Sequence, residues 1–168
     1  MVDPVMVAKS GDRLLAADAV LALREYLLPL SSLLTPNLPE AADLLGCAEA
    51  ANRNDMESQA RELVKLGTKA VLLKGGHLLG GESPDLLLTA EGEKHWFTSP
   101  RVQTRNTHGT GCTLSSALAT QLALTGNVLQ ACKAAKNYIS QAIAGADALS
   151  VGHGHGPTDH FAIIRSEL

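Results

Sequence analysis

Apolar residues recur along the chain in two patterns, short unbroken runs and longer stretches in which they return every three or four positions. Short runs bounded by turn residues predict strands buried in a sheet, and the longer periodic stretches predict amphipathic helices. The predicted strands cover residues 2–7, 33–35 and 70–74. The predicted helices cover residues 16–28, 39–45, 54–66 and 129–149, and a further one follows Gly111.

Boundary residues support these helices. Pro39 suits a first helical turn, and Gly67 ends the helix over 54–66. The helix over 16–28 has Asp12 or Asp18 near its start and Pro29 beyond its end. Each of these helices is expected to pack its apolar face on a sheet.

Two further polar-apolar segments, 85–89 and 94–98, are separated by Ala90-Glu91-Gly92-Glu93 and predict an antiparallel hairpin at a sheet edge. Apart from this ribbon, strands alternate with helices. Such alternation is typical of an α/β fold with a parallel sheet and helices on both faces. Residues 1–168 are expected to form a single domain.

The stretch from Asn106 to Ser116 carries the strongest chemical signal. A β-friendly approach over 102–105 runs into Gly109 and Gly111, and a small-residue helix begins at once. Uncovered N–H groups at such a helix N-terminus attract phosphate, and the same field favours the thiolate of Cys112 in the first turn. The alternative is a glycine-rich N-cap with a buried cysteine, and the local pattern leaves both open.

Two common phosphate motifs are excluded at this turn. No lysine follows the second glycine, as a nucleotide-binding P-loop requires, and Leu114 stands where the dinucleotide fingerprint needs a third glycine.

Polar residues at the predicted strand ends are the other candidates, because ligands of open α/β sheets bind beyond the carboxyl ends of strands. Lys74, followed by Gly75-Gly76-His77, is either a phosphate ligand or a solvated strand-end residue. Asp3 is either an ordinary strand-end residue or a carboxylate at the mouth of a ligand-binding site. Asn37 and Glu40 are either an N-cap with a first-turn acid or part of a site.

Composition and charge narrow the class of protein. The chain has 168 residues, a net charge of -3 and no run of basic residues, which argues against nucleic-acid binding. It has no apolar run of membrane-spanning length and no N-terminal signal pattern. Its three cysteines are odd in number and widely spaced, which favours a reducing cytoplasm over a disulfide framework.

The tail over 152–160 contains three histidines at close spacing, which in principle suits zinc. Its flanking glycines offer no rigid presentation, and no carboxylate or cysteine partner is obvious. We therefore expect no metal at the tail.

The segment Thr107-His108-Gly109-Thr110-Gly111-Cys112-Thr113-Leu114-Ser115 resembles the signature of the hydroxymethylpyrimidine and phosphomethylpyrimidine kinases of thiamine biosynthesis, in the ribokinase superfamily. Segments 3–11, 37–40, 74–77 and 152–160 match the same family in the same order. The resemblance implies a three-layer αβα ribokinase-like fold with a mainly parallel central sheet. In the family, a first βαβ region that contacts the pyrimidine precedes the segment 3–11, so the chain is expected to lack this N-terminal portion.

The resemblance also implies a reaction, ATP-dependent phosphorylation of the hydroxymethylpyrimidine and then of its monophosphate, with Mg2+ as cofactor. Cys112 matches the position at which most of the superfamily has a catalytic aspartate. The implied roles are catalysis by Cys112, Gly109, Thr110 and Gly111, phosphate or ATP binding by Lys74, Asn37 and Thr107, and water-mediated Mg2+ binding by Glu40 and Asp3.

Alternatives remain at this stage. Hydroxyethylthiazole kinase also places a cysteine after a Gly-x-Gly turn, and pyridoxal kinases have similar architecture. A truncated or split chain that binds nucleotide or a partner without catalysis is a different kind of protein. The expected partners are ATP and the pyrimidine, with a homodimer or a complementing N-terminal segment as further options, in the cytoplasm and without nucleic acid or membrane.

Overall fold

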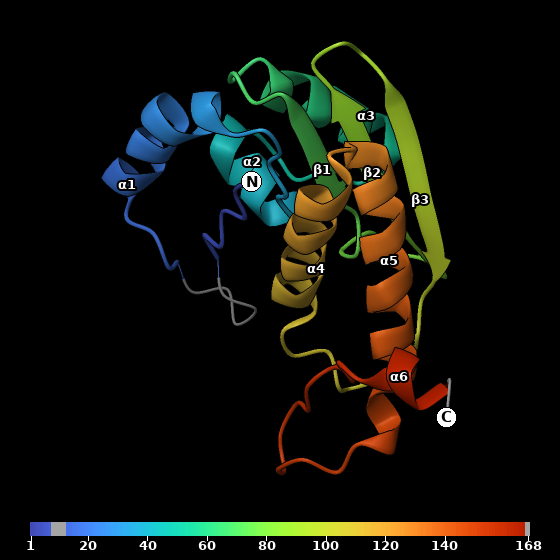
Figure 1. Ribbon diagram of the computed structural model, residues 1–168. Helices are drawn as coiled ribbons and strands as arrows, with labels where there is room; N and C mark the ends of the chain where they lie inside the picture. Colours follow the sequence, from blue (N-terminus) through green and yellow to red (C-terminus); the bar gives the residue numbers. More distant parts are fainter. Residues whose placement is uncertain (8–12, 167–168) are drawn as a thin grey trace. The chain divides into compact units, whose positions relative to one another are not determined.

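The computed structural model describes residues 1–7 and 13–166 (Figure 1). Residues 8–11 of the family segment 3–11, and the alternative helix start at Asp12, lie outside the described residues. Residue contacts divide the chain into two compact units, unit 1 (Met1–Ser99) and unit 2 (Pro100–Leu168). That the chain is a single domain stays a prediction.

Unit 1 is built on a three-stranded sheet of order β1-β2-β3, with β1 at Ala70–Lys74, β2 at Glu82–Thr89 and β3 at Lys94–Pro100. β1 and β2 are antiparallel, and their register places Lys74 opposite Asp85. The predicted strand over 70–74 is confirmed at both ends. The predicted hairpin is confirmed as β2 and β3, each a few residues longer than expected.

On the other edge of β1, two segments continue the sheet in parallel through isolated bridges. Val2 bridges Leu34, and Leu34 bridges Val71. The backbone N–H of Leu34 donates to the carbonyl of Ala70 at 2.9 Å. These segments are shorter than the strands predicted over 2–7 and 33–35, because Pro4 and Pro36 cannot donate to a ladder.

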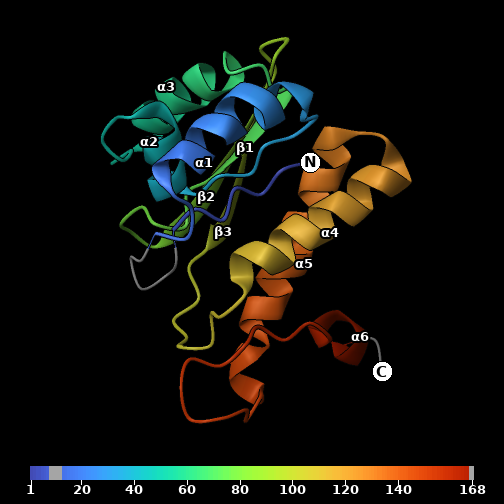
Figure 2. The same ribbon diagram turned by 90° about the vertical axis from the view of Figure 1, so that its left-hand side faces the viewer.

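Among its described residues, unit 1 has three helical segments. The first runs as α1 (Ala17–Ala22), the π-helix η1 (Leu23–Leu27) and the 3-10 helix η2 (Leu28–Leu30). The prediction that Pro29 lies beyond the helix is wrong, because proline is tolerated early in the new 3-10 turn. The other two, α2 (Leu38–Leu45) and α3 (Arg53–Val64), lie along the sheet (Figure 2).

The core of unit 1 lies between the sheet and these helices. Burial of leucine, valine and methionine side chains stabilises such a layer, at about 1.5–3 kcal/mol for each large side chain. Members without exposed surface include Leu28, Leu34, Leu44, Met56, Leu63, Val71, Leu73 and Leu86.

Unit 2 consists of α4 (Thr110–Thr125), α5 (Val128–Ala144), η3 (Ala146–Ala148) and α6 (Ala162–Ser166). α4 and α5 lie side by side (Figures 1 and 2). The helix predicted over 129–149 ends at Ala144, and η3 follows it. The β-friendly approach over 102–105 forms no strand: these residues are irregular, and the Thr104 hydroxyl accepts from the N–H of Asn106 at 3.0 Å, a local bond that competes with sheet pairing.

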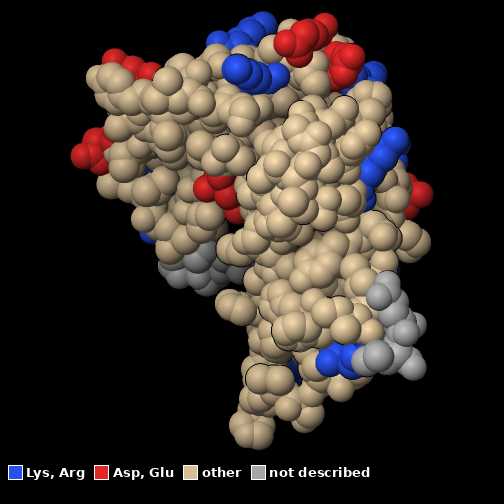
Figure 3. All heavy atoms as spheres, in the orientation of Figure 1, with Lys and Arg blue, Asp and Glu red and all other residues tan. Residues whose placement is uncertain are grey.

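Little charge lies over α4, whose sequence contains no Asp, Glu, Lys or Arg. Figure 3 shows the corresponding surface almost free of blue and red. Within the described residues, no helix combines the length and the apolarity needed to cross a membrane.

Candidate active site

The turn that opens α4, residues 107–112, is called the α4 turn below. Gly109 is the N-cap of α4 and has φ +78°, a left-handed conformation that glycine adopts without strain. The N–H of Thr113 donates to the carbonyl of Gly109 at 2.8 Å and closes the first helical turn. Gly111 lies inside that turn, whereas Gly109 bends the chain into it.

The first-turn amides of α4 point out of the helix without a capping side chain. Among the described residues, no side chain accepts a capping hydrogen bond at the N-terminus of α4, where Gly109 is the N-cap. The first turn contains no acidic residue. The Thr110 N–H has a long contact of 3.4 Å with the carbonyl of Thr107. Because helix N-terminal amides lack intrahelical partners and carry a partial positive charge, this end of α4 is suited to hold a phosphate.

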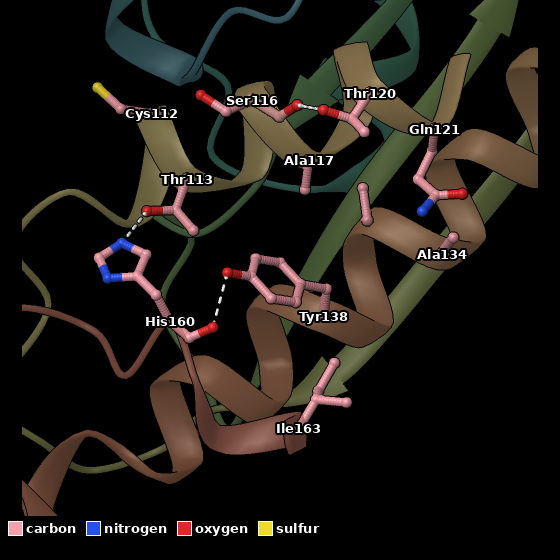
Figure 4. A pocket seen from close by; sticks show the side chains of 11 residues that line it. Cys112, Thr113, Ser116, Ala117, Thr120, Gln121, Ala134, Tyr138, His160 and Ile163 are labelled. Carbon is pink, nitrogen blue, oxygen red and sulfur yellow. Dashed lines mark hydrogen bonds between the residues drawn. The ribbon is translucent and has the colours of Figure 1, made fainter. Parts of the chain in front are cut away.

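Cys112 is exposed in that first turn and is not in a disulfide. The alternative interpretation, a glycine N-cap with a buried cysteine, is therefore confirmed for the N-cap, Gly109, and wrong for Cys112; the buried cysteine is Cys132 on α5. Cys112 and Thr113 line one end of a groove of about 580 Å³ within unit 2, together with Tyr138 and His160 (Figure 4).

In unit 1, Asp3 and Lys74 form an ion pair. The Lys74 ammonium donates to Asp3 Oδ1 at 3.0 Å, and the side chains are 12% and 16% exposed for Lys74 and Asp3. The Thr35 hydroxyl donates to the same oxygen at 3.1 Å. The three residues come from three adjacent parallel segments, where strand ends are expected to collect ligand groups. Sequence reasoning missed Thr35.

Asn37 and Glu40 form a capping box at the start of α2. The N–H of Glu40 donates to Asn37 Oδ1, and the N–H of Asn37 donates to Glu40 Oε2, both at 2.8 Å. The N–H of Met6 donates to Glu40 Oε1 at 3.3 Å, which ties the loop after Asp3 to α2. The N-cap interpretation is therefore confirmed, and a role in catalysis stays a prediction.

These carboxylates are compatible with a hydrated magnesium ion. The described residues contain no cluster of three metal-ligating side chains. Magnesium keeps several waters and needs few direct protein ligands. Both bonds to Asp3 fall on Oδ1, so Oδ2 can accept from a bound water, and each oxygen of Glu40 has a second lone pair.

The turn after β1 requires glycine at position 75. A Cβ on Gly75 would lie 2.0 Å from the carbonyl oxygen of Pro84. The Gly75 N–H donates to Oδ1 of Asp85, a buried carboxylate, at 3.0 Å. Asp85 therefore fixes the backbone next to Lys74, and sequence reasoning missed it because its apolar neighbours gave it the appearance of an ordinary strand residue.

The structure thus brings the predicted site residues together in two sets. In unit 1, Asp3 contacts Lys74, and Asn37 contacts Glu40. In unit 2, Thr107, Gly109, Thr110, Gly111 and Cys112 share the α4 turn.

Two features of this chain are typical of the ribokinase-like α/β kinases: a sheet whose strand ends carry polar groups, and a glycine turn that opens a helix. Solved structures of that class share this fold. One is the Bacillus subtilis pyridoxal kinase in an ADP complex, with a TM-score of 0.86 and 37% identity, matched over 96% of this chain and 60% of that one. Within this class, the chain belongs to the phosphomethylpyrimidine kinase family, whose model matches residues 1–159.

Curated relatives agree with the family. The hydroxymethylpyrimidine/phosphomethylpyrimidine kinase of Escherichia coli (strain K12) is 53% identical over 96% of this chain. The thiamine biosynthesis bifunctional protein ThiED of Geobacter sulfurreducens is 50% identical over the same share, which is 32% of that protein. The chain spans about 60% of the length of the Escherichia coli relative.

Proposed function

We propose that this chain takes part in the ATP-dependent phosphorylation of 4-amino-5-hydroxymethyl-2-methylpyrimidine and of its monophosphate, in thiamine biosynthesis. The observation that carries the proposal is the uncapped N-terminus of α4 with an exposed cysteine in its first turn. Family membership supports the choice of substrate. The proposed location is the cytoplasm, where ATP is available.

In the proposed mechanism, the α4 turn stabilises charge and moves a proton. The first-turn amides and the helix dipole hold the negative charge that develops on the transferring phosphoryl group. The Cys112 thiolate takes the proton of the attacking hydroxyl as general base. Thr107, whose carbonyl accepts from the Thr110 hydroxyl at 2.9 Å, keeps the turn in shape for the phosphates.

The unit 1 residues neutralise phosphate charge. Lys74 offers an ammonium group at the end of β1, and Asn37 offers an amide at the N-terminus of α2. Asp3 and Glu40 are the residues that would hold a hydrated Mg2+. When bound, this ion supplies positive charge to the phosphate oxygens.

A pyridoxal kinase activity is the second candidate, because the Bacillus subtilis structure with high similarity is a pyridoxal kinase. Both acceptors present a hydroxymethyl group on a nitrogen-containing ring. The sequence identity favours the pyrimidine, since the Escherichia coli relative is 53% identical and this neighbour is 37% identical.

A coupled ADP-release assay with ATP and magnesium tests the proposal. The purified chain is given in turn the hydroxymethylpyrimidine, its monophosphate, pyridoxal, hydroxyethylthiazole or no acceptor. We expect ADP release above the no-acceptor rate with the two pyrimidines. Faster turnover with pyridoxal would assign the second candidate, and equal rates with and without every acceptor would contradict the proposal.

Repeating the assay with the relatives' N-terminal region added tests for a complementing segment. Measuring the mass of the active species tests for a homodimer.

A further inference from the structure

The histidine-rich tail is bonded to the α4 turn, although neither the sequence interpretation nor the proposed mechanism gives it a role. In the turn, the N–H of His108 donates to the carbonyl of Gly156 at 3.1 Å, and on the approach to it the N–H of Gly156 donates to Asn106 Oδ1 at 3.1 Å. A Cβ on Gly156 would lie 2.4 Å from that Asn106 oxygen, so the close approach needs glycine. His155 Nδ1 lies 3.2 Å from the carbonyl of Arg105.

Beyond the turn, a side chain of the tail reaches α4. His160 Nε2 lies 3.1 Å from the hydroxyl of Thr113, a contact that Figure 4 shows at one end of the groove. Either tautomer of the ring suits this contact, because a hydroxyl both donates and accepts. Thr113 directly follows Cys112, and its N–H closes the first helical turn on Gly109.

The backbone around His160 is itself held firmly. The Tyr138 hydroxyl of α5 donates to the carbonyl of His160 at 3.0 Å, as Figure 4 shows. The N–H of Asp159 donates to the carbonyl of Ala142 at 2.8 Å. The buried Asp159 carboxylate accepts from the N–H of Phe161 and pairs with Arg165. An exposed histidine ring is thus carried on a segment fixed by α5 and α6.

We propose that His160 is a positioning residue for phosphoryl transfer: through the Thr113 hydroxyl it fixes the first turn of α4, and His155 and Gly156 fix the approach to that turn. The orientation of the first-turn amides and of the Cys112 thiol depends on this turn. Displacement of a catalytic group by about 1 Å can slow a reaction by roughly a hundredfold. The kinetic part of this proposal rests on the proposed function.

The test is a double-mutant cycle between His160→Ala and Thr113→Val. Each single variant is expected to lower kcat by roughly tenfold to a hundredfold, with a smaller change in the KM for ATP. The double variant is expected to be no slower than the slower single variant, because both changes break one contact. Thr113→Ser, which keeps the hydroxyl, is expected to retain most of the activity.

Thr120→Val is the matched control. Thr120 lines the same groove, but its hydroxyl donates to Ser116 within α4, so this variant is expected to keep the wild-type kcat. If His160→Ala keeps the wild-type kcat, or if its effect adds fully to that of Thr113→Val, the proposal is wrong. A loss of kcat in Thr113→Ser as large as in Thr113→Val would also overturn it.

A second readout separates this proposal from the proposed function. Amide hydrogen exchange at position 113, whose N–H closes the first helical turn on Gly109, reports how firmly the turn is held, whatever the chain phosphorylates. We expect faster exchange at this amide, relative to its intrinsic rate, in His160→Ala and in Thr113→Val, and unchanged exchange in Thr120→Val. Unchanged exchange in His160→Ala would overturn the positioning role of His160, even if the enzyme is active. Faster exchange in a chain without any turnover would support the positioning role and contradict the proposed function.

Discussion

Asp3 and Lys74 show how much a single contact depends on its surroundings. Both side chains are largely buried, and their charges compensate each other at 3.0 Å. In such a pair, loss of one partner leaves the other charge without compensation, which costs more than loss of both. The pair therefore serves the stability of unit 1 as well as the proposed binding of phosphate.

Replacing Lys74 by Met, or Asp3 by Asn, is expected to lower the free energy of unfolding, by about 1–3 kcal/mol for each change. The double variant is expected to lose less than the sum of the two. Urea unfolding of the four proteins measures the coupling. Strictly additive losses would show that the two charges do not interact.

Gly75 gives a second prediction at the scale of one residue. Gly75→Ala places a methyl group against the Pro84 carbonyl, so the turn must shift, and we expect a loss of about 1–3 kcal/mol in the free energy of unfolding. Gly76→Ala is the control, because its Cβ would meet only the Ser83 hydroxyl, at 3.6 Å. Equal stability of Gly75→Ala and Gly76→Ala in urea unfolding would contradict this account of the turn.

At the scale of elements, α2 combines a structural cap with a proposed binding role. Asn37→Ala is expected to cost about 1 kcal/mol of stability, as the loss of a cap usually does. Asn37→Asp keeps the cap acceptor but adds negative charge, so it is expected to keep stability and raise the KM for ATP. Unfolding curves and ATP titrations measure the two effects separately.

Asn127→Ala is the control for this prediction. Asn127 caps α5 by accepting from the N–H of Gln130 at 3.0 Å, and its loss is expected to lower stability without changing the KM for ATP. An unchanged KM in Asn37→Asp would mean that Asn37 is a cap and nothing more.

Elements with strong local signals could be predicted from the sequence, and elements that depend on distant neighbours could not. β1 and α3 have unbroken apolar or periodic patterns, and both lie where the patterns indicated. The segment over 102–105 has β-friendly residues, yet the Thr104 hydroxyl bonds the local backbone instead. The first helix continues through Pro29 because it changes to 3-10 geometry, which periodicity does not reveal.

The residues of the candidate site also divide into those with a local sequence signal, which could be predicted, and those that depend on distant neighbours, which could not. Motif residues such as Cys112 and Lys74 could be named from the sequence, because glycine turns and strand ends are local features. Thr35, Asp85 and His160 could not, since each acts on a residue at least 10 positions away: the sequence separations are 32, 10 and 47. Their roles depend on strand register and on the path of the tail.

At the scale of the whole molecule, the tail contains a pH-sensitive group, Asp159. The hydrogen bond from Arg165 lowers the pKa of Asp159 below its ordinary value; the Phe161 N–H also lowers it, and burial opposes both. A group with a lowered folded pKa stabilises the protein fully above its unfolded pKa, about 3.9 for aspartate. This contribution is lost as the pH falls through the lowered folded value.

We therefore expect acid to destabilise the wild-type chain more than Asp159→Asn, whose side chain does not titrate. The measurement is the urea midpoint at pH 7 and below pH 4, with the exposed Glu91→Gln as control. If Asp159→Asn and the wild type lose the same stability in acid, the ion pair with Arg165 makes no pH-dependent contribution.

The central claim is that Cys112, in the first turn of α4, acts on the acceptor hydroxyl. Its most direct test is the rate of pyrimidine-dependent ADP release by Cys112→Ala, compared with the wild type and with Cys47→Ala, which removes the other exposed cysteine. The account predicts that Cys112→Ala lowers the rate by roughly a hundredfold or more while Cys47→Ala leaves it unchanged. A Cys112→Ala rate equal to that of the wild type would contradict the account.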